Sequence, residues 1–201
     1  MNNKTVIGIS GFARSGKDTL ASFLDSKLNE RGFSSKIFSF AGALKLDMES
    51  FLLDKFGISP FTNESDLKSK IRPLMIAYGN AQRDSSKGVY WINRLKPEID
   101  SFFEGNGNVA IIPDLRFKQY KFDEFDFIKS YNSNFIVTVS RQLEDGSMNK
   151  PAHSSEEASA PFFVKNADYN LIWGTYSDKF LLEKKAKDCI DSIFTFLNSK
   201  K

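Results

Sequence analysis

Gly11-Phe12-Ala13-Arg14-Ser15-Gly16-Lys17-Asp18-Thr19 is the stretch that decides the fold of this chain. It follows an apolar, β-branched run at 5–9 and precedes a segment whose apolar side chains recur at helical spacing. Strand, glycine loop, lysine and helix make up the phosphate-binding P-loop, GxxxxGK. The backbone N–H groups of such a loop point into one concavity, and the helix N-terminus adds a partial positive charge. The sequence therefore predicts an enzyme that uses a nucleotide.

The end of the motif departs from the strict pattern, in which a Ser or Thr hydroxyl directly after the lysine ligates Mg²⁺. Here Asp18 follows Lys17, and Thr19 comes one residue later. The Gly-Lys-x-Thr ending is similar to that of adenylate-kinase-like nucleoside monophosphate kinases. Two interpretations of Asp18 stay open: it contacts Mg²⁺ through water, or it caps the helix, where a carboxylate suits the N-terminal dipole. The residues that we expect to hold ATP are Gly11, Arg14, Ser15, Gly16, Lys17, Asp18 and Thr19.

Length and composition fit one globular domain, 1–201, since 41% of the 201 residues are hydrophobic. The single cysteine, Cys189, rules out an intramolecular disulfide, and we expect a reduced, cytoplasmic setting. A net charge of +3 does not by itself imply a nucleic-acid partner. No apolar run approaches the roughly 20 residues that span a bilayer, so we expect no membrane association. We expect no leader either, because residues 1–4 run directly into the first strand.

Short apolar strands alternate with helical patterns along the chain. The predicted strands are 5–10, 36–40, 109–113, 134–140 and 169–173, and the predicted helices are 17–31, 42–56, 64–81, 87–104, 118–130 and 178–198. This alternation predicts a three-layer α/β sandwich around a doubly wound parallel sheet of about five strands. The stretch 41–105 is too long for one crossover and predicts an inserted helical region for a second substrate. The polar stretch 141–160 predicts a lid.

Charged residues follow two of the predicted strands. Asp114-Leu115-Arg116 comes directly after the third strand, and Arg141 ends the fourth. An acidic residue at this place commonly orients Mg²⁺ through water in P-loop enzymes, and a strand-end ion pair is the alternative. The third predicted strand does not end in the Walker B pattern of motor ATPases, Asp followed by Glu, and the Asn-Lys-x-Asp of GTPases is absent.

The inserted region carries further candidates. Arg72 and Arg83 suit an acceptor phosphate, because a guanidinium grips phosphate with a bidentate fork, although either alone could be a surface charge. The pair at 90–91, Tyr-Trp, either walls a nucleobase pocket or packs on a helix. Lys45 reaches a phosphate or is solvated.

The lone histidine lies in His153-Ser154-Ser155-Glu156. No second histidine or cysteine ligand accompanies it, which argues against a zinc site. The segment is typical of a lid element in which a serine starts a short helix.

Together these motifs resemble the phage-type deoxynucleoside monophosphate kinases. The residues that carry the resemblance are 11–19, 72–83 around Tyr78-Gly79, Tyr90-Trp91, Asp114-Leu115-Arg116, Arg141 and 153–156. The resemblance implies a P-loop kinase fold and transfer of a phosphoryl group from ATP, with Mg²⁺, to a deoxynucleoside 5′-monophosphate. It also implies that the protein can be a homodimer. Many relatives carry a glutamate four residues after the Asp-x-Arg arginine, and this chain has Tyr120 there.

Each candidate receives a role under this hypothesis. The catalytic residues are Lys17, Arg141, Asp114 and Arg116; the substrate-binding residues are Lys45, Arg72, Tyr78, Arg83, Tyr90, Trp91, Arg116 and Glu156; the metal-binding residues are Asp18 and Asp114. Two alternatives remain: a P-loop kinase for another small phosphorylated metabolite, such as phosphomevalonate or dephospho-coenzyme A, and an inactive nucleotide-binding regulator.

Overall fold

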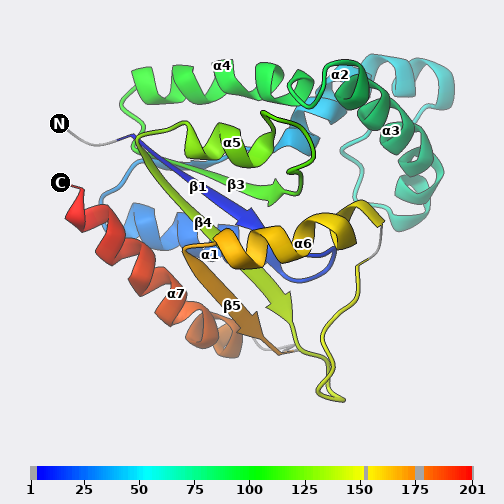
Figure 1. Cartoon of the computed structure of the whole chain (residues 1–201). Helices are drawn as coiled ribbons and strands as arrows, with labels where there is room; N and C mark the ends of the chain where they lie inside the picture. The colour runs from blue at the N-terminus through cyan, green and yellow to red at the C-terminus, as the bar shows by residue number, and fades with distance from the viewer. Residues whose placement is uncertain (1–3, 152–153, 175–178, 201) are drawn as a thin grey trace.

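A parallel sheet forms the centre of the molecule. The computed structural model describes residues 4–151, 154–174 and 179–200, without the side chains at 154–156 and 179–180. Within these residues the sheet has five strands in the order β2-β3-β1-β4-β5, all parallel (Figure 1). The strands are β1 Thr5–Ser10, β2 Ser35–Ile37, β3 Val109–Leu115, β4 Ser133–Arg141 and β5 Tyr169–Trp173. The predicted α/β sandwich is confirmed.

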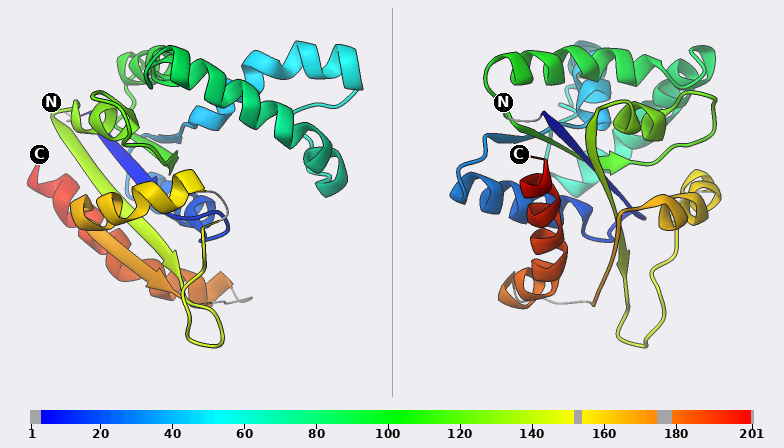
Figure 2. Two further views of the ribbon diagram at one scale, coloured as in Figure 1. Left: turned by 45° about the vertical axis from the view of Figure 1, so that its right-hand side comes forward. Right: turned by 60° about the vertical axis from the view of Figure 1, so that its left-hand side comes forward.

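Helices cover both faces of the sheet (Figure 2). The helices of one face are α1 Lys17–Glu30 and α7 Lys179–Ser199; those of the other side are α2 Phe40–Phe56, α3 Ser65–Ser85, α4 Tyr90–Glu104, α5 Glu124–Lys129 and α6 Ser154–Asn166. Helix α3 packs on α2 and α4 and projects away from the sheet. Alternate side chains of β1 pack on opposite faces of the sheet. Ile7 and Ile9 pack with α1 and α7, whereas Val6 packs with the helices of the other face. Strands buried on both faces contain continuous apolar runs, and β1, β3 and β4 do so.

The chain reverses its direction of winding at β1. In the sheet β3 and β4 flank β1 on its two sides, and α5 carries the chain from one to the other across β1. Ligands of open parallel sheets bind beyond the carboxyl ends of the strands at such a switch point. The loop after β1 is the P-loop, so the fold places it where a ligand is expected.

Two predicted elements were partly wrong, each because a side chain caps a helix. The predicted strand 36–40 ends at Ile37, because Ser39 caps α2 by accepting a hydrogen bond from the Gly42 backbone N–H (3.0 Å). The predicted helix 118–130 begins only at Glu124, where Asp123 and Asp126 form a capping box. The inserted region 41–105 does consist of helices, and its role in binding an acceptor stays a prediction.

Candidate active site

Two glycines of the P-loop have conformations and surroundings that a side chain would not tolerate. Gly11 has φ +146°, and a Cβ there would lie 2.2 Å from the Val139 carbonyl oxygen. Gly16 has φ +95°, and a Cβ there would lie 2.1 Å from the ring of Trp173. The glycines therefore let the loop close tightly against β4 and β5.

Trp173 forms the floor of the P-loop, a role that the sequence analysis missed. It is 3% exposed at the end of β5. Its indole Nε1 donates to the Ser15 carbonyl oxygen at 2.5 Å, and its ring lies under Gly16. Only the position of a large aromatic residue at the end of the last strand could have signalled this contact.

The loop has the groups that a phosphate needs. Lys17 is 6% exposed, and its Nζ donates to the carbonyl oxygens of Gly11 and Phe12, both at 2.7 Å. The hydroxyl of Ser15 is buried and has no hydrogen-bond partner in the described part of the chain. Asp18 is exposed in the first turn of α1, where its charge suits the helix dipole. A loop that its glycines let close tightly, a buried ammonium group and an orphaned hydroxyl fit a phosphate cradle.

Asp114 caps α2 in this structure. Its carboxylate accepts hydrogen bonds from the Ser39 hydroxyl (2.8 Å) and from the backbone N–H groups of Phe40 (3.2 Å) and Ala41 (2.7 Å). These bonds join the end of β3 to the start of the inserted region. No group of three or more His, Cys, Asp or Glu side chains suited to a metal occurs among the described residues. The metal-binding role of Asp114 and Asp18 stays a prediction.

Arg141 lies beside the P-loop. Its Nη1 donates to the Arg14 carbonyl oxygen at 3.3 Å. Asn149 holds it there: Asn149 Oδ1 accepts from the Arg141 N–H (3.1 Å), the Asn149 N–H donates to the Arg141 carbonyl (2.8 Å), and Asn149 Nδ2 donates to the Ala13 carbonyl (3.4 Å). A single antiparallel bridge, Gln142 to Met148, closes the turn between them. The start of the predicted lid is thus a hairpin that contacts the P-loop, and Asn149 went unnoticed in the sequence.

Arg116 lines a cavity that Gly11 and Phe12 of the P-loop also line. Glu124 fixes the backbone at Arg116, because its Oε2 accepts hydrogen bonds from the N–H groups of Arg116 (2.8 Å) and Phe117 (3.1 Å). Burial raises the pKa of Glu124 to about 8, and the nearby Asp114 charge adds to the shift, against the hydrogen bond from Arg116.

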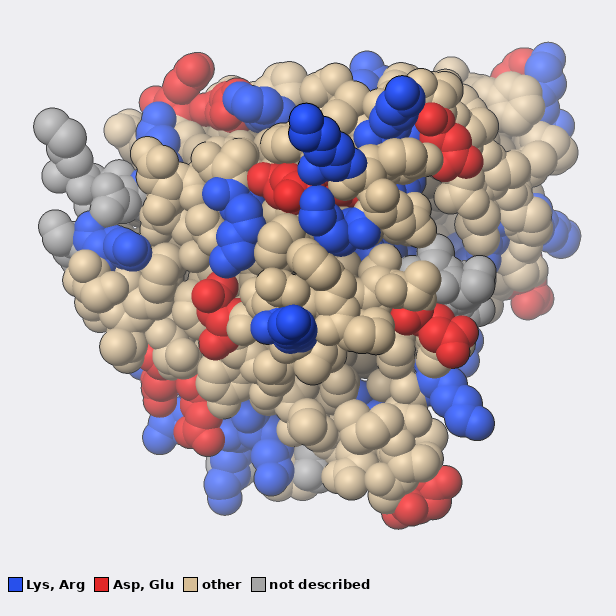
Figure 3. Space-filling view, in the orientation of Figure 1, with Lys and Arg blue, Asp and Glu red and all other residues tan. Residues whose placement is uncertain are grey.

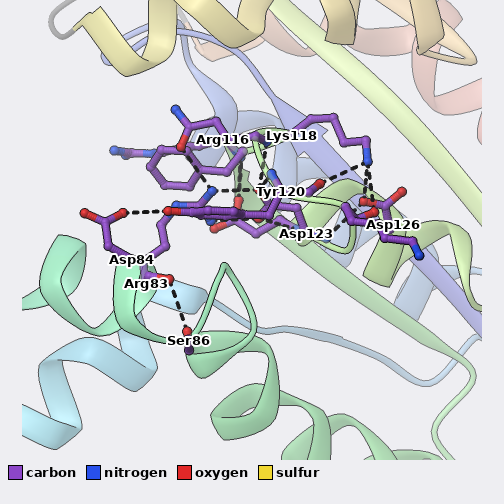
Figure 4. Close-up of polar contacts among 12 residues, drawn as sticks. Arg83, Asp84, Ser86, Arg116, Lys118, Tyr120, Asp123 and Asp126 are labelled. Carbon is purple, nitrogen blue, oxygen red and sulfur yellow. Dashed lines mark hydrogen bonds and ion pairs between the residues drawn. The ribbon is translucent and has the colours of Figure 1, made fainter.

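Arg83 has a different partner from the one predicted. Its Nη1 and Nη2 donate to the two carboxylate oxygens of Asp123 at 2.7 and 2.6 Å, and the two side chains are 4% and 0% exposed (Figure 4). Its guanidinium also stacks 3.8 Å from the centre of the Phe117 ring. Burial acts to raise the pKa of Asp123, but the bonds from Arg83 and from backbone N–H groups outweigh it and lower that pKa. The geometry favours a structural role for Arg83 over contact with a substrate.

Tyr120, which stands where many relatives have glutamate, belongs to the same network. Its hydroxyl donates to Asp84 Oδ1 at 2.9 Å, and its ring centre lies 5.2 Å from the Arg83 guanidinium. Asp123 also accepts from the Gln119 (2.9 Å) and Tyr120 (3.2 Å) N–H groups. The loop that follows Arg116 is therefore fixed to α3.

The aromatic candidates of the inserted region surround Asp47, which the sequence analysis did not single out. Asp47 accepts hydrogen bonds from the hydroxyls of Tyr78 (2.6 Å) and Tyr90 (3.0 Å) and pairs with Arg94. Trp91 is 6% exposed, packs edge-on against both tyrosines, and donates to the Gly79 carbonyl at 3.1 Å. Of the two interpretations of the Tyr-Trp pair, the structure favours packing on a helix.

The remaining candidates are dispersed. Lys45 is half-buried on α2, with its Nζ 5.5 Å from the centre of the Phe61 ring. Arg72 is exposed on α3, and Thr19 is half-buried on α1. Glu156 lies on α6, but its side chain is outside the described set, and His153 is outside it altogether.

Basic and acidic side chains intermingle on the face drawn in Figure 3. The helices that the structure describes include none with the length and apolar character to cross a bilayer.

Comparisons with known proteins give only remote likenesses. No protein-family model and no curated protein matches the chain. Solved structures that are similar to it include the Mycobacterium tuberculosis APS kinase CysC in complex with AMPPNP and APS, at 13% identity and a TM-score of 0.45, covering 96% of this chain and 99% of that one. The TT1252 protein of Thermus thermophilus has 16% identity, a TM-score of 0.45 and coverages of 96% and 97%. Dephospho-CoA kinase from Campylobacter jejuni has 14% identity, a TM-score of 0.38 and coverages of 96% and 98%. Two of these three neighbours are kinases by name. Likenesses this remote carry no argument about activity, and the fold assignment rests on the sheet order and the P-loop.

Proposed function

We propose that this chain transfers the γ-phosphoryl group of ATP to the 5′-phosphate of a deoxynucleoside monophosphate. The observation that carries the proposal is the convergence of two arginines on one P-loop. Arg141 reaches it from β4, with its Nη1 3.3 Å from the Arg14 carbonyl oxygen, and Arg116, directly after β3, lines a cavity together with Gly11. A P-loop binds the phosphates of one nucleotide, and arginines beside it are suited to a second phosphate and to the group in transit.

The attacking oxygen of a 5′-phosphate is already ionised at neutral pH, so the reaction needs alignment and charge neutralisation and no general base. Lys17 and the backbone N–H groups of 11–17 bind the phosphates of ATP in this proposal. Arg116 holds the acceptor phosphate together with Arg72, the exposed arginine of the inserted region. Arg141 stabilises the transferring group. Arg83 is left out, because Asp123 occupies both of its Nη groups.

Asp18 and Asp114 are the carboxylates that would hold Mg²⁺, which is usually bound by one or two carboxylates together with substrate phosphates. The ion would neutralise charge on the phosphate oxygens of ATP. Residues 141–151, tied to the P-loop through Asn149, would help to exclude water during transfer. The homodimer stays a prediction from the resemblance, the cytoplasmic setting stays a prediction from the single cysteine, and the acceptor's base is left open.

A coupled ADP-release assay with ATP, Mg²⁺ and each common deoxynucleoside and nucleoside monophosphate tests the proposal. We expect release that depends on a deoxynucleoside monophosphate. Lys17→Ala should lower this turnover by at least roughly a hundredfold while the protein stays folded. Lys27→Ala is the matched control, because Lys27 lies on the same helix and forms an exposed ion pair with Glu30. ATP binding without any nucleotide acceptor would reject the proposed substrate and turn the search to other phosphorylated metabolites.

A further inference from the structure

A small cavity lies at the switch point of the sheet, directly beside the P-loop. It measures about 70 Å³ and is enclosed by the carboxyl ends of β1, β3 and β4 and by α6. Much of its wall is apolar, from Leu115 of β3, Val139 of β4 and Phe163 of α6. Arg116 lies at the same wall. The cavity therefore adjoins both the phosphate loop and the arginine proposed for the acceptor phosphate.

One hydroxyl in this wall has no partner. Ser159 of α6 is 4% exposed and lines the cavity, and its Oγ makes no hydrogen bond within the described part of the chain. Thr138, which also lines the cavity, differs, because its hydroxyl bonds to the Asn170 side chain. A helical serine commonly donates to the carbonyl four residues earlier, and Ser159 does not. Since a buried hydroxyl without a partner is costly, a ligand group is the natural partner of Ser159.

The size and the lining of the cavity limit which part of a ligand it can bind. About 70 Å³ is far below the roughly 300–1,000 Å³ of a pocket that encloses a whole ligand, so the cavity takes one part of a larger molecule. A phosphate would find one charged donor, Arg116, and otherwise largely apolar walls. A nucleobase presents several polar edge atoms, and among the residues that line the cavity only the Ser159 hydroxyl is buried without a partner in the described part of the chain. A sugar ring with apolar C–H edges and one free hydroxyl matches one unpartnered serine in a largely apolar wall.

We propose that this cavity binds the deoxyribose of the acceptor nucleotide and that Ser159 hydrogen-bonds its 3′-hydroxyl. The inference rests on the proposed function and names the group that selects the sugar. A ribose would bring a second hydroxyl into a wall that is largely apolar and in which Ser159 already serves the 3′-hydroxyl. The loss from one unpaired buried hydroxyl corresponds to a roughly tenfold to hundredfold lower kcat/KM for ribonucleotides.

The test compares Ser159→Ala with the native chain on three forms of the best acceptor: the 2′-deoxy, the 2′,3′-dideoxy and the ribonucleotide. We expect Ser159→Ala to lower kcat/KM for the deoxynucleotide about tenfold, chiefly through KM, and to leave the dideoxynucleotide unchanged. Ser101→Ala, an exposed serine of α4, is the matched control and should change neither. Thermal unfolding should find Ser159→Ala at least as stable as the native chain, since it loses an unpaired buried hydroxyl. A functional loss then does not come from misfolding.

An equal loss with the deoxy and dideoxy acceptors, or no loss with either, would overturn the role of Ser159. Binding of 2-deoxyribose 5-phosphate, followed by NMR chemical shifts of the native chain and of Ser159→Ala, separates this inference from the proposed function. Binding that weakens in the variant, with no nucleotide accepted in the ADP-release assay, would support the sugar site and reject the kinase proposal. Active turnover of deoxynucleotides that is indifferent to Ser159 would reject the sugar site and leave the kinase proposal standing.

Discussion

Replacing Glu124 with Gln should flatten the dependence of folding stability on pH. Glu124 is 3% exposed, and the two groups bonded to its Oε2 are neutral backbone N–H groups of Arg116 and Phe117. Burial therefore raises its pKa from an ordinary 4.5 to about 8. Between those two pH values the folded chain holds a proton that the unfolded chain has released.

The sign of the effect follows from that proton. Because the folded state binds more protons than the unfolded state in this window, the free energy of unfolding falls as pH rises. The stability from the protonated carboxyl is fully present below pH 4.5 and is lost as pH rises through about 8. With a slope of about 1.4 kcal/mol per pH unit, the native chain should lose about 5 kcal/mol across the window through this group. The amide introduced by Glu124→Gln would keep an oxygen for the two N–H groups and would not titrate.

Urea unfolding at intervals between pH 5 and pH 9, followed by far-UV circular dichroism, measures the effect. The informative quantity is the difference in unfolding free energy between the native chain and Glu124→Gln, because the titration of groups such as Asp123 cancels in it. That difference should shift by about 4 kcal/mol in favour of the variant between pH 5 and pH 9. Glu98→Gln, at an exposed position of α4, should give no such shift. Parallel pH profiles for the native chain and Glu124→Gln would refute the burial argument.

Three further substitutions test other parts of the structure. Gly16→Ala should destabilise the chain and abolish nucleotide binding, because its methyl group would lie 2.1 Å from the Trp173 ring at a φ of +95°; thermal unfolding and ATP titration measure both effects. Arg83→Met should cost about 3–5 kcal/mol in urea unfolding, since it leaves the fully buried Asp123 carboxylate uncompensated, and a loss below about 1 kcal/mol would contradict a structural ion pair. Asn149→Ala should lower kcat in the ADP-release assay about tenfold with little change in stability, because it releases the lid hairpin from the P-loop; unchanged kcat would show that the hairpin needs no such tie.

The sequence was sufficient for the architecture because the signals are local. The three central strands β1, β3 and β4 contain short apolar runs, and GxxxxGK marks the switch from β1 to α1. The errors arose where a side chain competes with the backbone pattern. Residues 118–123 look helical by apolar spacing, but the N–H groups of Gln119 and Tyr120 turn inward to Asp123, which also caps α5. The capping box of Asp123 and Asp126 is visible in the sequence and could have placed the start of α5 correctly.

The sequence predicted the P-loop itself, but it did not predict the residues that pack around the loop. Contacts between residues far apart in the chain, such as Trp173 with Ser15 and Asn149 with Ala13, leave no local pattern. Ser159 gave no signal either, since a helical serine is ordinary until its hydroxyl is seen to be buried without a partner in the described part of the chain.

The sequence cannot tell which arginine is available for a phosphate and which one has a structural partner, whereas the structure can. Arg83 and Arg116 are equally good phosphate ligands by residue type, but Arg83 already has both Nη groups on a carboxylate that is fully buried. To bind a phosphate it would have to abandon Asp123, and a buried charge left without its partner costs about 3–5 kcal/mol. Arg116 lines the cavity beside the P-loop, and Glu124 accepts from its backbone N–H. Binding of a substrate anion at Arg116 would leave intact the Arg83–Asp123 ion pair that holds the β3–α5 loop to α3, and the proposal therefore places the acceptor phosphate at Arg116.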